Sequence, residues 1–156
     1  MTTFYVSDTN GNDSNNGESQ ATAKKTIGAA VTLASTDGDI VEIIDEATYD
    51  DESQLVIAAN NVTLTHTASE LGRPVFDASG FGFGEAIKVG TNTGNTKRGF
   101  ILNGIEIKGS HHSSGQDLFD NANLTNNSNG MVISDCFIHA FSGLSDNIMQ
   151  TEAGEV

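Results

Sequence analysis

The sequence predicts an all-β fold of the solenoid type, closed at its N-terminal end by a short α-helix. After Gly38, short apolar runs alternate with polar turns, and no second run is long enough for a helix. Residues 99–109 also align with residues 130–140, apolar position on apolar position, at an offset of 31. A repeat of this length, built as strand, tight polar turn and strand, describes one corner of a parallel β-helix coil.

The elements begin with a strand at 4–6, followed by a segment at 7–19 that is rich in Asp, Asn, Gly and Ser and favours turns. The one clear helix is predicted over 26–34, where a single apolar stripe recurs at helical spacing. The stripe consists of Ile27, Ala30, Val31 and Ala34. Because the first coil of a solenoid exposes apolar surface and unpaired strand edges, we expect this stripe to cover it.

Nine further strands are predicted after the helix. They lie at 40–44, 55–58, 62–65, 75–76, 86–89, 100–102, 105–107, 131–133 and 136–139. The segments 90–98 and 110–129 are predicted as loops between coils, and long excursions from a solenoid often carry the binding function. Candidate residues for binding a carbohydrate or a protein partner are therefore the polar side chains of the second loop, namely His111, His112, Asn121, Asn123 and Asn126.

The length of 156 residues fits one domain, which we divide into a cap at 1–37 and coils at 38–156. Near its C-terminal end, Ile148 and Met149 begin another strand, and no amphipathic segment follows before Val156. We expect this end of the solenoid to be open, so that another protein or a second copy can dock there.

Charge and cysteine content exclude several classes of function. Acidic residues outnumber basic ones by 21 to 7, for a net charge of −14, which argues against nucleic acid and anionic membranes as partners. Cys136 is the only cysteine, so no intrachain disulfide is possible, and its alignment with Ile105 favours a core position. We expect no transmembrane segment and no signal peptide, because long apolar runs and a basic N-terminal region are absent.

Several blocks of the first fifty residues carry a resemblance to a known superfamily. The blocks are FYVS at 4–7, GNDSNNG at 11–17, KTIGAA at 25–30, GDIVEI at 38–43 and ATY at 47–49. Together they resemble the N-terminal section of right-handed parallel β-helix proteins of the pectate-lyase-like superfamily. The resemblance implies a right-handed coil whose first turn is capped by the opening strand, polar loop and helix. It implies no single activity, because lyases, epimerases, hydrolases, adhesins and phage tail proteins share this section.

Lyases of that superfamily abstract a proton with a Lys or Arg, while Ca²⁺ held by acidic residues neutralises the substrate carboxylate. The basic candidates here are Arg73, Lys88, Lys97, Arg98 and Lys108, and the acidic candidates are Asp77, Glu106 and Asp135. Glu106 and Lys108 should point outward from one strand. Phe137 takes the place of Glu106 in the next repeat, so we expect no acidic ladder. The sequence leaves catalysis open but favours no catalytic residue in this chain; the enzyme alternative is a polysaccharide lyase.

Metal and cofactor sites are not expected. The segment from Asp8 to Asp13 has oxygen ligands at alternate positions, as in a calcium loop. It lacks the Gly and the Glu that an EF-hand requires, because Asp13 and Ser19 occupy those places. A looser Ca²⁺ site there remains an alternative. The adjacent pair His111–His112 is better explained as a solvated loop, since neighbouring residues on a strand point to opposite faces.

These observations favour a structural or attachment component of a virus particle, of the phage type. The reasons are the missing export signal, the shortage of basic catalytic groups and the open end of the solenoid. A capsid decoration protein, a head fibre or a tail-spike part would fit, located in the virion. The expected partners are other virion proteins, copies of this chain in a homotrimer, or a glycan. The alternative is the N-terminal fragment of a secreted, extracellular polysaccharide lyase or hydrolase, or of a carbohydrate-binding adhesin.

Overall fold

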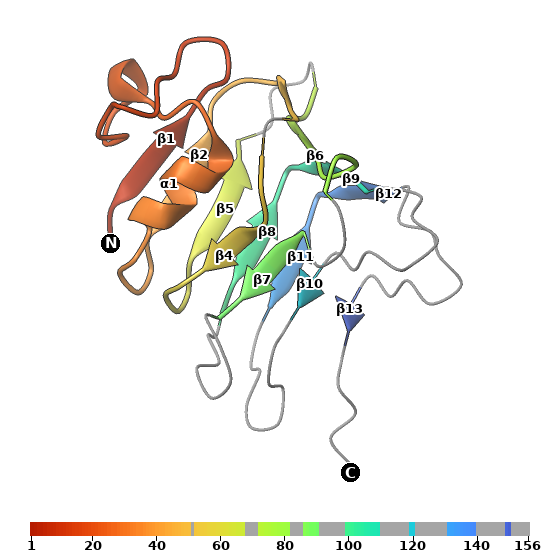
Figure 1. Ribbon diagram of the computed structural model, residues 1–156. Coiled ribbons are helices and arrows are strands. Elements are labelled where there is room, and N and C mark those ends of the chain that lie inside the picture. Colours follow the sequence, from red (N-terminus) through yellow and green to blue (C-terminus); the bar gives the residue numbers. More distant parts are fainter. Residues whose placement is uncertain are drawn as a thin grey trace.

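The computed structural model describes residues 1–50, 52–67, 72–81, 86–90, 99–109, 119–120, 131–139 and 149–150. These residues form mostly short strands, arranged in three parallel sheets, with very little helix (Figure 1). The predicted all-β class is confirmed at this level. No helix in the described part of the chain is long and apolar enough to cross a membrane.

Each sheet collects strands that lie far apart in the sequence. The first sheet has the order β1 (Thr3–Val6), β2 (Ile40–Ile43), β5 (Thr63–His66), β8 (Ile101–Asn103) and β11 (Val132–Ser134). The second has the order β3 (Thr48–Tyr49), β6 (Val75–Asp77), β9 (Glu106–Lys108) and β12 (Phe137–His139). The third has the order β4 (Leu55–Ile57), β7 (Ile87–Val89), β10 (Phe119–Asp120) and β13 (Met149–Gln150).

The chain therefore visits the three sheets in the same order again and again. From β2 onward it passes through the first, second and third sheets, and then returns to the first, in four successive passages. Every strand pairs in parallel with its counterpart in the neighbouring passage. Figure 1 follows this progression from β1 in red to β12 and β13 in blue.

The pairing register reproduces the repeat that the sequence contains. Ile101 lies opposite Val132 in the first sheet, and Glu106 lies opposite Phe137 in the second. Both pairs are 31 positions apart, as the alignment of the two segments predicts. The predicted substitution of Phe137 for Glu106 at one position of the repeat is thus confirmed.

Alternation along the strands separates core from surface. In the first sheet, Val41, Leu64 and Leu102 are buried at equivalent positions, and their neighbours along each strand are more exposed. In the second sheet, Phe76 and Ile107 are buried in the same way. Because side chains of a strand point alternately to opposite faces, the inward side of each sheet is apolar and contributes to one core.

Helix α1 (Ile27–Leu33) coincides with the predicted helix. Thr26 is its N-cap and accepts a hydrogen bond from the Ala29 amide through its hydroxyl. The predicted apolar stripe is buried throughout: its members are Ile27, Ala30, Val31 and the C-cap residue Ala34. The helix contacts β1, β2 and, above all, β4, which is the end strand of the third sheet (Figure 1).

Two short strands and a 3-10 turn were not predicted. The turn η1 spans Gln20–Thr22. Strands β3 and β10 contain two residues each, too few for a period-two pattern to be visible in the sequence. The prediction of an uninterrupted loop over 110–129 was therefore wrong at residues 119–120.

Candidate functional site

The outer face of the second sheet brings together three of the catalytic candidates named from the sequence, namely Asp77, Glu106 and Lys108. Side chains of β6, β9 and β12 that alternate with the buried row point away from the core. The register sets them in two columns of three. We call this set the outer patch; it comprises Val75, Glu106 and Phe137 in one column and Asp77, Lys108 and His139 in the other.

One ion pair and one hydrogen bond connect neighbouring strands within the outer patch. Lys108 donates through Nζ to Asp77 Oδ2 at 2.7 Å, along one column. His139 Nε2 and Glu106 Oε1 lie 2.8 Å apart, on a diagonal between the columns. Burial alone would raise the pKa of Asp77, but hydrogen bonds from Lys108 and Ser79 outweigh it and hold that pKa below its ordinary value.

An exposed aromatic ring completes the outer patch. Phe137 is 53% exposed, whereas Phe76 on β6 is buried in the core. The ring stacks at a tilt of 30° on the His139 imidazole, with 4.8 Å between ring centroids. Sequence reasoning did not nominate Phe137 as a site residue. The repeat could have identified it, because Phe137 occupies an outward position at which the preceding repeat has Glu106.

A second ion pair borders the outer patch. The Arg73 guanidinium donates to the Asp135 carboxylate, so it connects the segment before β6 with the turn between β11 and β12. Asp135 holds that turn with a φ of 50°, and Gly104 holds the equivalent turn of the preceding passage with a φ of 75°. Asn103–Gly104 and Ser134–Asp135 are thus the same turn in successive passages, as their alignment predicts.

The structure brings together some of the predicted catalytic candidates and separates others. Asp77, Glu106 and Lys108 lie side by side in the outer patch, and Glu106 and Lys108 point outward as predicted. Lys88 lies on β7 in the third sheet. Lys97 and Arg98 fall outside the described residues.

Most of the predicted binding residues also lie outside the described part of the chain. These are His111, His112, Asn121, Asn123, Asn126, Ile148 and Val156. Met149, a predicted residue of the open end, belongs to the short strand β13. Cys136 is half-buried against the core, and burial raises the pKa of its thiol, which disfavours the reactive thiolate.

A polar ladder runs along the outside of the first sheet. Asn103 donates through Nδ2 to Thr65 Oγ1 at 3.2 Å, and Ser134 donates through Oγ to Asn103 Oδ1 at 2.9 Å. The three residues occupy one register position in three successive passages. The ladder therefore connects the passages by side-chain hydrogen bonds in addition to the backbone pairing.

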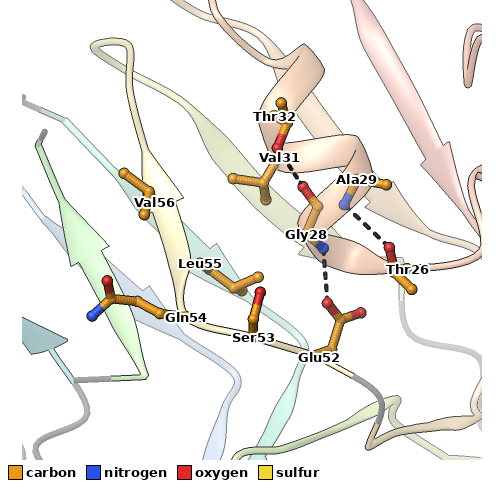
Figure 2. A pocket seen from close by; sticks show the side chains of 10 residues that line it. All are labelled: Thr26, Gly28, Ala29, Val31, Thr32, Glu52, Ser53, Gln54, Leu55 and Val56. Carbon is orange, nitrogen blue, oxygen red and sulfur yellow. Dashed lines mark hydrogen bonds between the residues drawn. The ribbon is translucent and has the colours of Figure 1, made fainter. Parts of the chain in front are cut away.

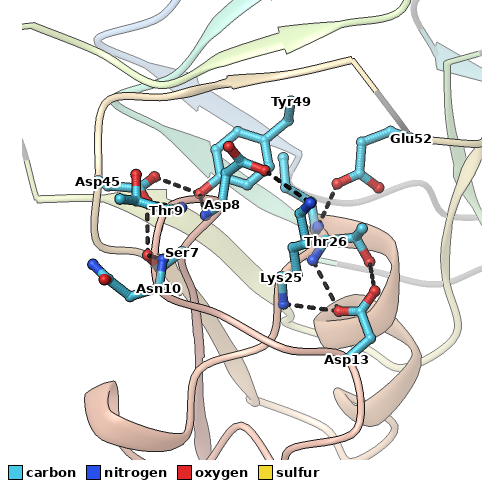
Figure 3. A network of polar contacts seen from close by, with 11 residues as sticks. Ser7, Asp8, Thr9, Asn10, Asp13, Lys25, Thr26, Asp45, Tyr49 and Glu52 are labelled. Carbon is cyan, nitrogen blue, oxygen red and sulfur yellow. Dashed lines mark hydrogen bonds and ion pairs between the residues drawn. The ribbon is translucent and has the colours of Figure 1, made fainter.

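The N-terminal loop is held by two carboxylates that accept several hydrogen bonds each (Figure 3). Asp13 accepts from the Lys25 and Thr26 amides at 2.8 and 3.0 Å and from the Thr26 hydroxyl. Asp45 accepts from the Tyr49 hydroxyl at 2.6 Å, and also from the Ser7 hydroxyl and the Thr9 amide. Burial would raise both pKa values, but these donors outweigh it and hold the pKa of each carboxyl below its ordinary value.

These contacts bear on the calcium loop considered at Asp8–Asp13. The Asp13 oxygens that would face a cation accept hydrogen bonds from the start of the helix instead, and Asp8 pairs with Lys25 at 3.8 Å (Figure 3). Within the described ranges, no group of three or more His, Cys, Asp or Glu side chains could hold a metal ion. The Asp13 carboxylate therefore holds the start of the helix.

A cavity of about 250 Å³ lies between α1 and the segment that leads into β4 (Figure 2). Its lining consists of Thr26, Gly28, Ala29, Val31, Thr32, Glu52, Ser53, Gln54, Leu55 and Val56. Glu52 accepts hydrogen bonds from the Ile27 amide and, at 2.9 Å, from the Gly28 amide. The acidic group of this cavity is therefore engaged in fixing the first turn of α1.

Comparison with known proteins gives a likeness in fold. No protein-family model matches the sequence, and no curated protein matches it either. The native crystal structure of the GH136 lacto-N-biosidase from Eubacterium ramulus is similar, with a TM-score of 0.64 at 17% identity over 95% of this chain. Its selenomethionine derivative gives a TM-score of 0.58 at 16% identity. The chain spans 29% of the length of the native hydrolase chain, so the likeness concerns one part of that protein.

Proposed function

We propose that this chain forms a right-handed parallel β-helix with a helical cap at its N-terminal end and serves as a structural or attachment component of a virus particle. A capsid decoration protein, a head fibre or a tail-spike part would use the fold in this way. Its partners would be other virion proteins or copies of the chain in a homotrimer. The observation that carries the proposal is the repeated route through three sheets, with passages that are joined on the outside by side-chain contacts.

Contacts from one passage to the next favour a mechanical role. The Thr65–Asn103–Ser134 ladder joins three passages along the first sheet. In the second sheet, the pair Asp77–Lys108 joins two passages, and the pair Glu106–His139 joins the next two. A stack in which each unit is attached to both neighbours resists bending and local opening, which suits a fibre or a shell component.

The contacts of two basic candidates also support a role without catalysis. Lys108 is paired with Asp77, and Arg73 is paired with Asp135. Each would have to leave its carboxylate partner before it could reach a proton of a substrate.

Mass spectrometry of purified virus particles from the source tests this function. We expect peptides of this chain in the particles, at a stoichiometry relative to the major shell protein that reveals its place. Many copies would indicate a decoration protein, and few copies would indicate a tail or fibre part. Absence from particles would overturn the proposal.

The second candidate is a segment of a secreted carbohydrate-active protein. The observation that favours it is the likeness in fold to part of a glycoside hydrolase, over 95% of this chain. Release of reducing ends or of unsaturated products from a polysaccharide panel, with and without Ca²⁺, tests it. Product release that an Arg98→Ala variant abolishes would place an active site in this chain, and we expect no release.

A further inference from the structure

We propose that the outer patch is a binding site for a neutral glycan, with the Phe137 ring as its stacking platform. Glu106, His139 and Lys108 would bond the hydroxyl groups of the sugar. This inference rests on the proposed attachment role and names the ligand class through which attachment occurs. It places the glycan on the second sheet and not on the residues of the 110–129 segment that were predicted from the sequence.

The aromatic ring is both exposed and oriented. The Phe residues on the inward side are buried, namely Phe4, Phe76 and Phe100, whereas Phe137 is 53% exposed. His139 stacks on the Phe137 ring, and Glu106 in turn fixes the imidazole through a hydrogen bond of 2.8 Å. A ring held in this way loses little side-chain entropy when a ligand stacks on it. The apolar C–H face of a sugar ring is a suitable partner for such a platform.

Polar groups surround the platform and are partly accessible. The exposed side-chain fractions are 43% for Lys108, 35% for His139 and 30% for Glu106. The Lys108 ammonium has three donors, and a carboxylate accepts at about four lone-pair positions. The contacts of Lys108 with Asp77 and of Glu106 with His139 each use one of these positions, so capacity remains for hydroxyl groups of a ligand. An apolar surface with a few oriented polar groups is typical of small-molecule sites.

The dimensions of the outer patch fit a short stretch of glycan. Outward neighbours along a strand are about 7 Å apart, and adjacent strands are about 4.8 Å apart. Three strands with two outward residues each therefore cover about 7 Å by 10 Å. This area accommodates one or two sugar rings that lie flat on the sheet.

Charge selects a neutral ligand over the alternatives. Both carboxylates of the outer patch are already paired, Asp77 with Lys108 and Glu106 with His139. A basic peptide would have to compete with these partners. An acidic glycan would approach a protein of net charge −14 and be repelled. A neutral sugar meets neither obstacle.

Isothermal titration and saturation-transfer NMR with neutral hexasaccharides test the site. The probes are cellohexaose, maltohexaose, mannohexaose and chitohexaose, and oligogalacturonate is the acidic comparison. We expect at least one neutral probe to bind, and Phe137→Ala to weaken that binding about tenfold, while Phe137→Trp retains it. Val132→Ala is the matched control, because Val132 is also exposed, at 47%, on the neighbouring first sheet. We expect that control to bind like the unaltered chain.

Each outcome decides a different claim. No binding of any neutral probe at millimolar concentration overturns the inference, and so does a preference for oligogalacturonate. Binding that Phe137→Ala leaves unchanged overturns the placement on the outer patch. The particle assay is independent of these results. If the chain is found in particles but binds no glycan, the proposed function stands and only this inference is overturned.

Discussion

The Glu106 carboxylate and the His139 imidazole lie 2.8 Å apart, although one belongs to β9 and the other to β12 of the following passage. The direct strand partner of Glu106 is Phe137, so the hydrogen bond runs diagonally across the pair. Glu106, His139 and Phe137 therefore form one unit. The Glu106 carboxylate orients the His139 imidazole, and the imidazole packs against the Phe137 ring.

A double-mutant cycle on Glu106→Gln and His139→Gln should give a modest coupling free energy. Both side chains are about one-third exposed, so solvent screens their attraction, and we expect a coupling of about 0.5 kcal/mol. Urea denaturation of the four proteins measures it. A coupling free energy of about 2 kcal/mol or more would contradict the view of this pair as a surface contact that orients rather than stabilises.

Replacing Tyr49 by Phe should destabilise the cap. The Tyr49 hydroxyl donates to Asp45 and accepts from the Asp8 amide at 3.0 Å, and the residue is buried. Loss of a hydrogen bond to a charged group leaves a partner unsatisfied, so we expect a loss of about 2 kcal/mol in the free energy of unfolding. Thermal and urea denaturation measure it. Tyr5→Phe, at a half-buried position on β1, is the control and should change stability much less.

Replacing Gly104 by Ala should be strongly destabilising. Its φ of 75° is a conformation that L-residues rarely adopt, and an added Cβ would collide with the His66 carbonyl oxygen. The conformational term alone costs about 1–2 kcal/mol, and the collision adds to it. Gly80→Ala is the matched control, because no atom lies within 4 Å of the position its Cβ would take. Equal melting temperatures for the two variants would contradict the geometry of this turn.

Stability should fall in acid. Asp13, Asp45 and Asp77 each have a pKa below the ordinary value in the folded state. A group whose folded pKa is depressed stabilises the fold above its unfolded pKa, and that contribution is lost as the pH falls through the folded pKa. We therefore expect the contribution of these three carboxyls to the free energy of unfolding to be constant above about pH 5 and to decline below about pH 4.

Urea denaturation between pH 2 and pH 7 measures this decline. Asp45→Asn should flatten the decline, because it removes one of the titrating groups along with its hydrogen bonds. Asp8→Asn is the comparison, since Asp8 is half-exposed and pairs with Lys25 at 3.8 Å. A decline that is identical in Asp45→Asn and in the unaltered chain would refute the role assigned to Asp45.

Local patterns explain how much of the fold was predictable. The helix at 27–33 is visible because Thr26 caps it and four apolar residues recur on one face. The register of β8 with β11 and of β9 with β12 is visible because the two segments align residue by residue. In contrast, β3 and β10 exist only because a neighbouring strand pairs with them, and two residues carry no periodicity.

The class of fold, the position of the cap, the repeat and the outward direction of Glu106 and Lys108 could be predicted from the chain, because they depend on the period of its apolar residues. Which charged side chains contact one another depends on the folded arrangement of the strands. Asp77 and Lys108 are 31 positions apart, and Arg73 and Asp135 are 62 apart. Such partners become neighbours only because strands of successive passages pair in parallel. The outer patch with its exposed Phe137 is for the same reason a property of the stacked sheets.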